Sequence, residues 1–360
     1  LTSEGNVVLS QPIRRTEEDH VAYAGQLFDV SGIRSASGMF RVGFWDTTRL
    51  RELSPSVAGL FTSDRRAVLV ADNYIAGQYD TVYIDTDGDL VFSDERALEV
   101  FNNSGDHVDL KAASVDAVMA VVVTSIEDNG ARVALGFDAN GHGTAIASVI
   151  SGNDHGFEGI APESKLIIVK AVGSSGNGTW EAALQGLQVA CNQGSDVVVV
   201  GLTADLLSMS GKEAISDVIA QNPHVLFVFP AGDSGPGVGT LASFGHYVNS
   251  VVVAGYVPGA ISRALGWGSG PMFWPWSSTG PDADGSVPDV SAPAVAPVLY
   301  PSWTRAVPEG SVGLLQGTSV SAACLTGIGA LTIGKMKATN DRFSPGTVKC
   351  LLVDSAVPLH

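Results

Sequence analysis

Two short segments of this 360-residue chain carry side chains that could act together as a base and a nucleophile. Residues 140–148 contain His142 between two glycines, and residues 316–322 contain Ser319 after a Gly-Thr pair. A serine hydroxyl is a weak nucleophile at neutral pH, so it needs a base such as imidazole within hydrogen-bond reach and a third group to orient that base. The pair therefore predicts a serine peptidase, and the third group has to be found elsewhere.

Both segments have the composition of a tight turn that opens a buried helix. Glycine or threonine flanks the reactive residue, and small and apolar residues follow it. The first turn of such a helix favours developing negative charge, because the helix dipole is positive there. For either segment alone, a structural role of the His or Ser at a glycine-rich helix start is an equally good interpretation.

Three further stretches follow in a fixed order along the chain. They are residues 159–162 leading into 165–171, residues 224–229 ending in 230–237, and residues 277–281 followed by 288–293. With these five ordered motifs, residues 138 to about 355 resemble the subtilisin-like serine proteases. The resemblance implies a serine-type endopeptidase in which His142 is general base and then acid, and Ser319 forms the acyl-enzyme. It also implies an α/β fold, a parallel sheet flanked by helices.

Composition excludes several classes of protein. With 45% hydrophobic residues the chain can bury a sizeable core, as one large domain or two ordinary ones. The net charge of −17 disfavours nucleic acid and anionic membranes as partners. No run approaches 18 uncharged apolar residues, so we expect no membrane span. The expected partner is a polypeptide substrate, and the chemistry requires no cofactor.

Cysteines and the first residues bear on the compartment. Cys191, Cys324 and Cys350 are odd in number and widely spaced, which predicts buried thiols and neither a disulfide framework nor a zinc site. The chain starts at Leu1 without a charged segment followed by an apolar one, so no signal peptide is visible. The start at a residue other than Met suggests a processed or truncated product. Analogy with the family favours an extracellular location.

The pattern after residue 165 alternates short apolar runs with amphipathic segments. We expect strands near residues 165–172, 196–202, 224–229 and 250–255, and helices over 180–192 and 212–221. Thr179 is the expected N-cap of the first helix, and Gly194 its stop. Strands buried on both faces with helical connections predict a parallel sheet.

The first 137 residues have a different pattern. Aromatic and β-branched stretches between turn-forming residues predict a mostly β region with its boundary just before Asp138. Residues 79–95 resemble the long insertion between the catalytic Asp and His of the pyrolysin and tripeptidyl-peptidase II branch. By this resemblance, residues 1–137 are the insertion and residues 138–360 are the catalytic core.

The aspartate of the triad is the open question, because the Asp-Thr-Gly signature of the family does not occur in the chain. Our favoured hypothesis is that this aspartate precedes Leu1. Asp85 is the next candidate, since it ends an apolar run and is followed by threonine; Asp46 and Asp29 are weaker. Asp85, Asp87 and Asp89 alternate around a glycine, which suggests a structural calcium loop or, equally, a solvated turn.

Other positions depart from the family. Asp233 occupies the place of the asparagine that donates to the oxyanion, and an ionised carboxylate cannot donate. Ala145 replaces a usual His, Ala323-Cys324 replaces Pro-His, and residues 197–203 lack the Asn-Met-Ser-Leu-Gly pattern. These differences keep a non-catalytic, peptide-binding protein open as an alternative.

The substrate pocket is also assigned by resemblance. One wall of the pocket for the residue before the cleaved bond would be Gly201, Leu202 and Thr203, and the other Pro230, Ala231 and Gly232. Small wall residues predict a preference for Leu, Phe or Met. A tripeptidyl-peptidase-type exopeptidase is the second enzymatic alternative, and a calcium-dependent structural protein is a further one.

Overall fold

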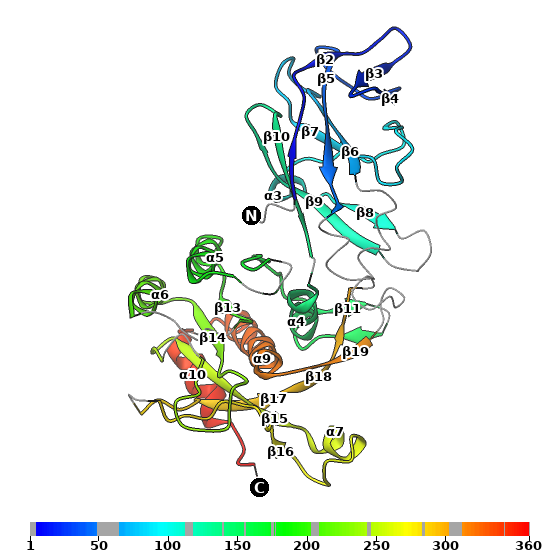
Figure 1. Ribbon diagram of the computed structural model, residues 1–360. Coiled ribbons are helices and arrows are strands. Elements are labelled where there is room, and N and C mark those ends of the chain that lie inside the picture. Colours follow the sequence, from blue (N-terminus) through cyan, green and yellow to red (C-terminus); the bar gives the residue numbers. More distant parts are fainter. Residues whose placement is uncertain are drawn as a thin grey trace. The chain divides into compact units, whose positions relative to one another are not determined.

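The computed structural model describes residues 5–48, 65–111, 118–138, 140–154, 156–173, 176, 178–202, 209–242, 246–282, 285–301, 312–341 and 343–359. The chain forms two compact units (Figure 1). Unit 1 comprises Leu1–Gly141 with Gly173–Ser175 and Pro301–Ser311, and unit 2 comprises His142–Val172, Gly176–Tyr300 and Val312–His360. The sequence placed the boundary just before Asp138, and the division between the units falls between Gly141 and His142.

Strands make up most of the regular structure that is described in unit 1. One antiparallel sheet has the order β1-β10-β9-β8, a second has the order β2-β5-β6-β7, and β3 and β4 form a hairpin. The elements are β1 (Asn6–Val8), β2 (Ile13–Arg14), β3 (His20–Tyr23), β4 (Gln26–Asp29), β5 (Met39–Asp46), β6 (Arg65–Ala71), β7 (Thr81–Ile84), α3 (Phe101–Ser104), β8 (Val108–Lys111), β9 (Val118–Glu127) and β10 (Arg132–Phe137).

Both faces of the β5–β6 pair are buried, which follows from the alternation of side chains along a strand. Trp45 and Val68 pack in one core with residues of β9 and β10, such as Val123. Phe40 and Leu69 point into a second core, which the hairpin and its neighbours cover. Unit 1 is therefore two packed sheets with a hairpin on the outer face.

Unit 2 is a mostly parallel sheet with helices on both faces. Strands β13, β14, β15 and β17 run parallel, and β16 pairs with β15 in the antiparallel direction. The elements are α4 (His142–Ser151), β11 (Asn153–Asp154), β12 (Phe157–Glu158), α5 (Trp180–Asn192), β13 (Val197–Val199), α6 (Met209–Gln221), β14 (Leu226–Pro230), β15 (Ser250–Val257), α7 (Gly259–Ala264), β16 (Met272–Phe273), β17 (Val290–Pro293), β18 (Val295–Leu299), β19 (Val312–Gln316), α9 (Thr318–Ala338) and α10 (Pro345–Asp354).

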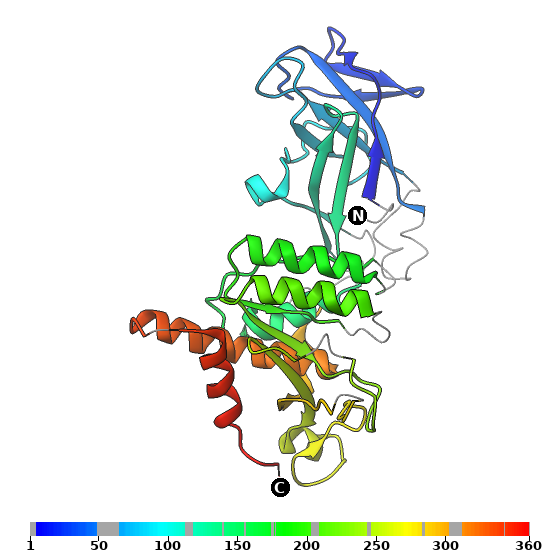
Figure 2. The same cartoon turned by 90° about the vertical axis from the view of Figure 1, so that its left-hand side faces the viewer.

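Strand β14 shows how the layers form. Leu226 and Val228 face the core beneath α4, α9 and α10, whereas Phe227 and Phe229 face the core beneath α5 and α6. Figure 2 shows α5 and α6 side by side. The predicted helix over residues 180–192 forms as α5, with the Thr179 hydroxyl accepting from Ala182 N at 3.2 Å and Gly194 at a φ of +79° just after its end.

Residues 318–327, the first half of helix α9, are buried on all sides within unit 2. By length and composition the helix could cross a membrane, but 61% of its most apolar window is buried in the unit. The pKa of its Cys324 thiol is raised by burial to about 11, so this thiol is unreactive at neutral pH.

Two predictions about unit 2 were wrong. Residues 165–172 form no strand, and Leu166, Ile167, Ile168 and Val169 are 43%, 43%, 70% and 37% exposed. An apolar run becomes a buried strand only where neighbouring strands and helices enclose it, and in the part of unit 2 that the structure describes this run has no strand partner. Cys350 is exposed, whereas Cys191 and Cys324 are buried as predicted.

Candidate active site

His142 is the first residue of α4 and directly follows the tight turn that the sequence predicted before this helix. The carboxylate of Asp138 accepts Asn140 N at 2.9 Å and Gly141 N at 2.8 Å, and Gly141 has a φ of +84°. Such a φ favours glycine, because a Cβ would clash with the backbone. The sequence did not predict that Asp138 caps this turn, although the Asp-x-x-Gly spacing is typical of a side chain that does so.

Ser319 lies in the first turn of α9, directly after Gly317 and Thr318. Gly317 has a φ of +127°, and Ser319 is 8% exposed. The Ser319 hydroxyl donates to the carbonyl of Gly201 at 3.3 Å. Gly201 follows β13, so a residue 118 positions earlier in the chain fixes the hydroxyl.

The same glycine also contacts the helix that carries His142. A Cβ at Gly201 would lie 3.7 Å from Ile146 Cγ2, so Gly201 packs on α4. Ile146 is four residues after His142, and residues four apart share a helix face. Helices α4 and α9 pack on each other in one core. The predicted base and nucleophile thus start from two helices that converge on Gly201.

The end of β14 meets the start of α9. Gly232 N donates to Thr318 Oγ1 at 3.1 Å, and Gly232 has a φ of +108°. A Cβ at Gly232 would lie 2.8 Å from that of Ala242, so only glycine fits without movement. The carboxyl ends of the parallel strands β13 and β14 therefore flank the nucleophile, as is usual for sites in α/β folds.

Of the predicted pocket walls, Gly201 and Leu202 are half-buried, and Pro230, Ala231 and Gly232 are buried. Thr203 lies outside the described residues. The backbone of these two segments borders Ser319 through Gly201 O, and through the Gly232–Thr318 hydrogen bond. Their assignment to a substrate pocket remains a prediction.

Asp233, the predicted oxyanion position, accepts three hydrogen bonds. Its Oδ1 accepts Thr318 N at 2.9 Å and the indole N–H of Trp274 at 3.1 Å, and its Oδ2 accepts Thr318 Oγ1 at 3.2 Å. Asp233 is an exposed residue, although these hydrogen bonds are partly buried. The contacts of Asp233 with Trp274 and Thr318 could not be predicted from the sequence, since both depend on the fold.

Asp85 lies in unit 1, in an acidic loop, whereas His142 and Ser319 belong to unit 2. Its carboxylate accepts Gly88 N at 2.6 Å and Leu90 N at 3.3 Å. Burial raises the pKa of Asp85, although these two hydrogen bonds lower it. The backbone of its own loop therefore engages both oxygens.

The same loop brings the predicted calcium ligands together. Carboxylate oxygens of Asp85, Asp87 and Asp89 lie within 4.8 Å of one another. Asp87 and Asp89 also accept backbone N–H groups two residues on, at 3.2 and 2.8 Å. These bonds suit a self-contained acidic turn as well as a cation site. Nearby, burial raises the pKa of Glu95 to about 7, despite hydrogen bonds from Thr86.

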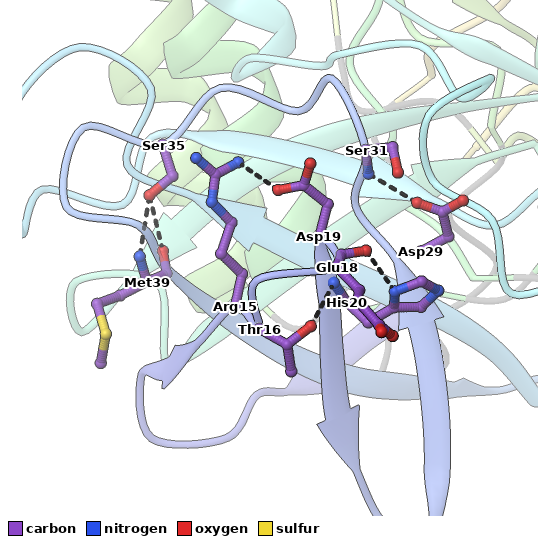
Figure 3. A network of polar contacts seen from close by, with 9 residues as sticks. All are labelled: Arg15, Thr16, Glu18, Asp19, His20, Asp29, Ser31, Ser35 and Met39. Atoms are coloured by element: carbon purple, nitrogen blue, oxygen red, sulfur yellow. Dashed lines mark hydrogen bonds and ion pairs between the residues drawn. The ribbon is translucent and has the colours of Figure 1, made fainter.

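The two weaker aspartates are also occupied by turns in unit 1. Asp29 accepts Ser31 N at 2.7 Å, beside a turn in which Arg15 pairs with Asp19 at 3.1 Å (Figure 3). Hydrogen bonding from Ser31 lowers the pKa of Asp29. Asp46 accepts Thr48 N at 3.0 Å. Each carboxylate thus has a local structural role.

Comparison with known proteins agrees with this geometry. Residues 98–359 match the model of the subtilase family. Pyrolysin of Pyrococcus furiosus is 27% identical over 340 residues, covering 80% of this chain and 24% of pyrolysin. Tripeptidyl-peptidase 2 of Oryza sativa subsp. japonica is 30% identical over 262 residues, covering 66% of this chain and 18% of that protein. The chain therefore spans about a quarter or less of these relatives.

A solved structure supports the fold alone. The structure described as sphericase has a TM-score of 0.50 and 21% identity, over 61% of this chain and 70% of that one. The predicted subtilisin-like α/β fold is confirmed, and its sheet, with helices on both faces, is that of unit 2.

Proposed function

This chain belongs to the subtilase family, and we propose that it is a serine endopeptidase that hydrolyses peptide bonds through an acyl-enzyme. The observation that carries the proposal is the convergence on Gly201, whose carbonyl accepts the Ser319 hydroxyl and whose Cα packs on the helix of His142. A structural serine or histidine would need no such pairing of two helix starts at strand ends.

The proposed reaction uses the two residues in turn. The Ser319 oxygen forms a bond to the substrate carbonyl carbon as its proton passes to the His142 imidazole. The imidazolium then gives that proton to the departing amine, and the C–N bond breaks. Water, deprotonated by His142, next attacks the carbonyl carbon of the ester. The bond from that carbon to the Ser319 oxygen breaks, the acid product leaves, and the His142 imidazolium returns the proton to Ser319. The Ser319 N–H stands in the first turn of α9, where no helix carbonyl lies four residues earlier, so it can donate to the oxyanion.

We propose that the orienting aspartate comes from sequence preceding Leu1. Two features of unit 2 support an absent strand at this place. In the described residues β13 ends the sheet and pairs only with β14, and the run from Leu166 to Val169 is exposed. Strand β13 and the run from Leu166 to Val169 both lie against α5. A Cβ at Gly186 of α5 would lie 3.2 Å from Val169 Cγ1, and α5 also packs on β13. One further apolar strand would cover both.

Labelling with a fluorophosphonate tests the chemistry. We expect the protein to gain one adduct mass, and its Ser319→Ala variant to gain none. Labelling of residues 1–360 alone would place the aspartate within the chain, and labelling only with the upstream segment would support our placement. If neither form is labelled, the endopeptidase proposal fails and the non-catalytic alternative takes its place.

Two peptide assays separate the alternatives and test the pocket. An N-terminally blocked peptide should be cut as fast as a free one, because an endopeptidase needs no free amine; strict dependence on the amine would indicate the tripeptidyl-peptidase type. Peptides with Leu, Phe or Met before the cleaved bond should be preferred. Equal turnover of peptides with Asp there would contradict the proposed pocket of Gly201, Leu202, Thr203, Pro230, Ala231 and Gly232.

We also propose a structural calcium ion in the acidic loop, supported by the proximity of Asp85, Asp87 and Asp89. Oxygen ligands on a short segment suit this cation. Millimolar Ca²⁺ should raise the melting temperature, and Asp87→Asn should remove the effect. An unchanged melting temperature with added Ca²⁺ would leave the solvated turn as the interpretation.

A further inference from the structure

Asp233 stands at the start of the nucleophile helix, and every hydrogen bond described for its side chain uses it as an acceptor. Thr318, the residue before the nucleophile, donates to it twice, from the backbone N–H and from the hydroxyl. First-turn N–H groups need acceptors, and a carboxylate near them is further favoured by the helix dipole. Asp233 is thus an N-terminal cap for α9, supplied by another part of the chain.

The turn before the helix makes room for this cap. Gly317 has a φ of +127°, and a Cβ there would lie 3.1 Å from Asp233 Oδ2. The Thr318 hydroxyl also accepts Gly232 N at 3.1 Å, so it links the end of β14 to the start of α9. The backbone that holds Ser319 is therefore tied to Asp233 on two sides.

Trp274 holds the carboxylate from the third side. Its indole N–H donates to Asp233 Oδ1 at 3.1 Å, and the side chain is 4% exposed. It packs with Val257, Ala294 and Val295, and its ring centroid lies 4.8 Å from that of Trp276. A buried, packed indole is a rigid donor, since few rotamers are open to it. Trp274 thus directs Asp233 toward Thr318.

We propose that Asp233, held by Trp274, is a positioning residue for Ser319 and does not donate to the oxyanion. The carboxylate anchors the Gly317–Thr318 turn, and the oxyanion is left to the backbone N–H of Ser319. An asparagine could replace this anchor, because its Oδ1 would still accept Thr318 N and Trp274 while its amide donates to Thr318 Oγ1. This inference rests on the proposed acyl-transfer chemistry.

The test compares Asp233→Asn, Asp233→Ala and Trp274→Phe in the full-length protein, with Trp276→Phe as the matched control. Trp276 is 52% exposed, and a phenylalanine at this position keeps an aromatic ring beside Trp274 without altering either partner of the Trp274–Asp233 hydrogen bond. The readout is the rate of fluorophosphonate labelling at saturating probe, with the probe's binding constant measured separately. The environment of Trp274 is measured by ¹⁹F NMR of protein that contains 5-fluorotryptophan. The chain has 6 tryptophans, so the spectrum has few signals, and the signal that is lost in Trp274→Phe is that of Trp274.

We expect Asp233→Ala and Trp274→Phe to label about 10- to 100-fold more slowly with little change in probe binding, since small misplacements of reacting groups have such effects. Asp233→Asn should stay within about tenfold of the parent protein, and Trp276→Phe should match it. Unchanged labelling of Asp233→Ala would overturn the proposal. So would a gain of about 100-fold or more in Asp233→Asn, the effect of a restored oxyanion donor.

The NMR signal separates this inference from the proposed function. If no form labels, the parent protein included, the endopeptidase proposal fails, and the Trp274 resonance then decides on the anchor. A Trp274 signal shifted by Asp233→Ala supports the anchor, and one that coincides with the parent signal overturns it.

Discussion

Two glycines of α9 should respond oppositely to the same substitution. A Cβ at Gly327 would lie 2.7 Å from Cβ and 2.9 Å from Cγ2 of Ile160, whereas nothing lies within 4 Å of a Cβ at Gly334. Carbon atoms in contact are normally about 3.5–4.0 Å apart, so Gly327→Ala requires a movement of roughly 1 Å. Ile160 cannot rotate its Cβ away, and its N–H is bound to Val149 O of α4 at 3.0 Å.

The magnitude follows from two opposing terms. Overpacking a core costs about 1–3 kcal/mol, and alanine gains about 1 kcal/mol over glycine within a helix. Gly327→Ala should therefore lower the free energy of unfolding by up to about 2 kcal/mol, whereas Gly334→Ala should raise it by about 0.5–1 kcal/mol. Only Gly327→Ala forces α9 away from the end of α4, so only this variant should slow fluorophosphonate labelling of Ser319.

Urea unfolding, followed by tryptophan fluorescence, measures both variants, and the labelling rate is taken on the same samples. Equal stability of the two variants would refute the close packing of α9 against Ile160. A destabilised Gly327→Ala variant with the parent labelling rate would refute the coupling of that packing to Ser319.

Two further predictions concern pH. The pKa of Glu95 is raised by burial to about 7 from an ordinary value of 4.5, so the folded state holds its proton longer and stability should fall as the pH rises from about 4.5 to 7. Glu95→Gln should make the melting temperature of unit 1 depend less on pH in this range. An unchanged dependence on pH would contradict the raised pKa of Glu95. Burial works to raise the pKa of Asp289, but hydrogen bonds, including those from His246 and Lys349, outweigh it and leave this pKa lowered. Lys349 Nζ lies 2.9 Å from Asp289 Oδ1. Lys349→Met should therefore lower the free energy of unfolding by about 1–2 kcal/mol at pH 7, and by less in acid, where Asp289 becomes protonated. The same loss of stability at all pH values would argue against the ion pair.

Local signals in the sequence were sufficient for several elements. The N-cap at Thr179 predicted where α5 begins, because a hydroxyl that accepts from the first turn depends on neighbouring residues alone. Continuous apolar runs likewise predicted β14 and β15, since strands covered on both faces have no polar side. No local signal predicted that the helices of His142 and Ser319 converge. That prediction depended on the order of five motifs along the chain and on their resemblance to a family.

Contacts between distant segments could not be predicted in this way. The run from Leu166 to Val169 has the composition of a buried strand, and only the fold shows that it has no strand partner in the described residues. Asp233 could be compared with a family position, but its engagement by Trp274 and Thr318 joins three segments 41 and 85 residues apart. Nothing local in the sequence distinguishes a donor from an acceptor there.

The open side of β13 has a consequence for handling the protein. Within the described residues β13 is a short edge strand, and the four exposed apolar residues Leu166 to Val169 lie beside it, so this side of the sheet offers an exposed edge and an apolar surface to another chain. When residues 1–360 are produced alone, we expect self-association through this edge, with losses that grow with concentration. Replacing Ile168, the most exposed of the four, by lysine would place a charge on the edge and should keep the protein in solution.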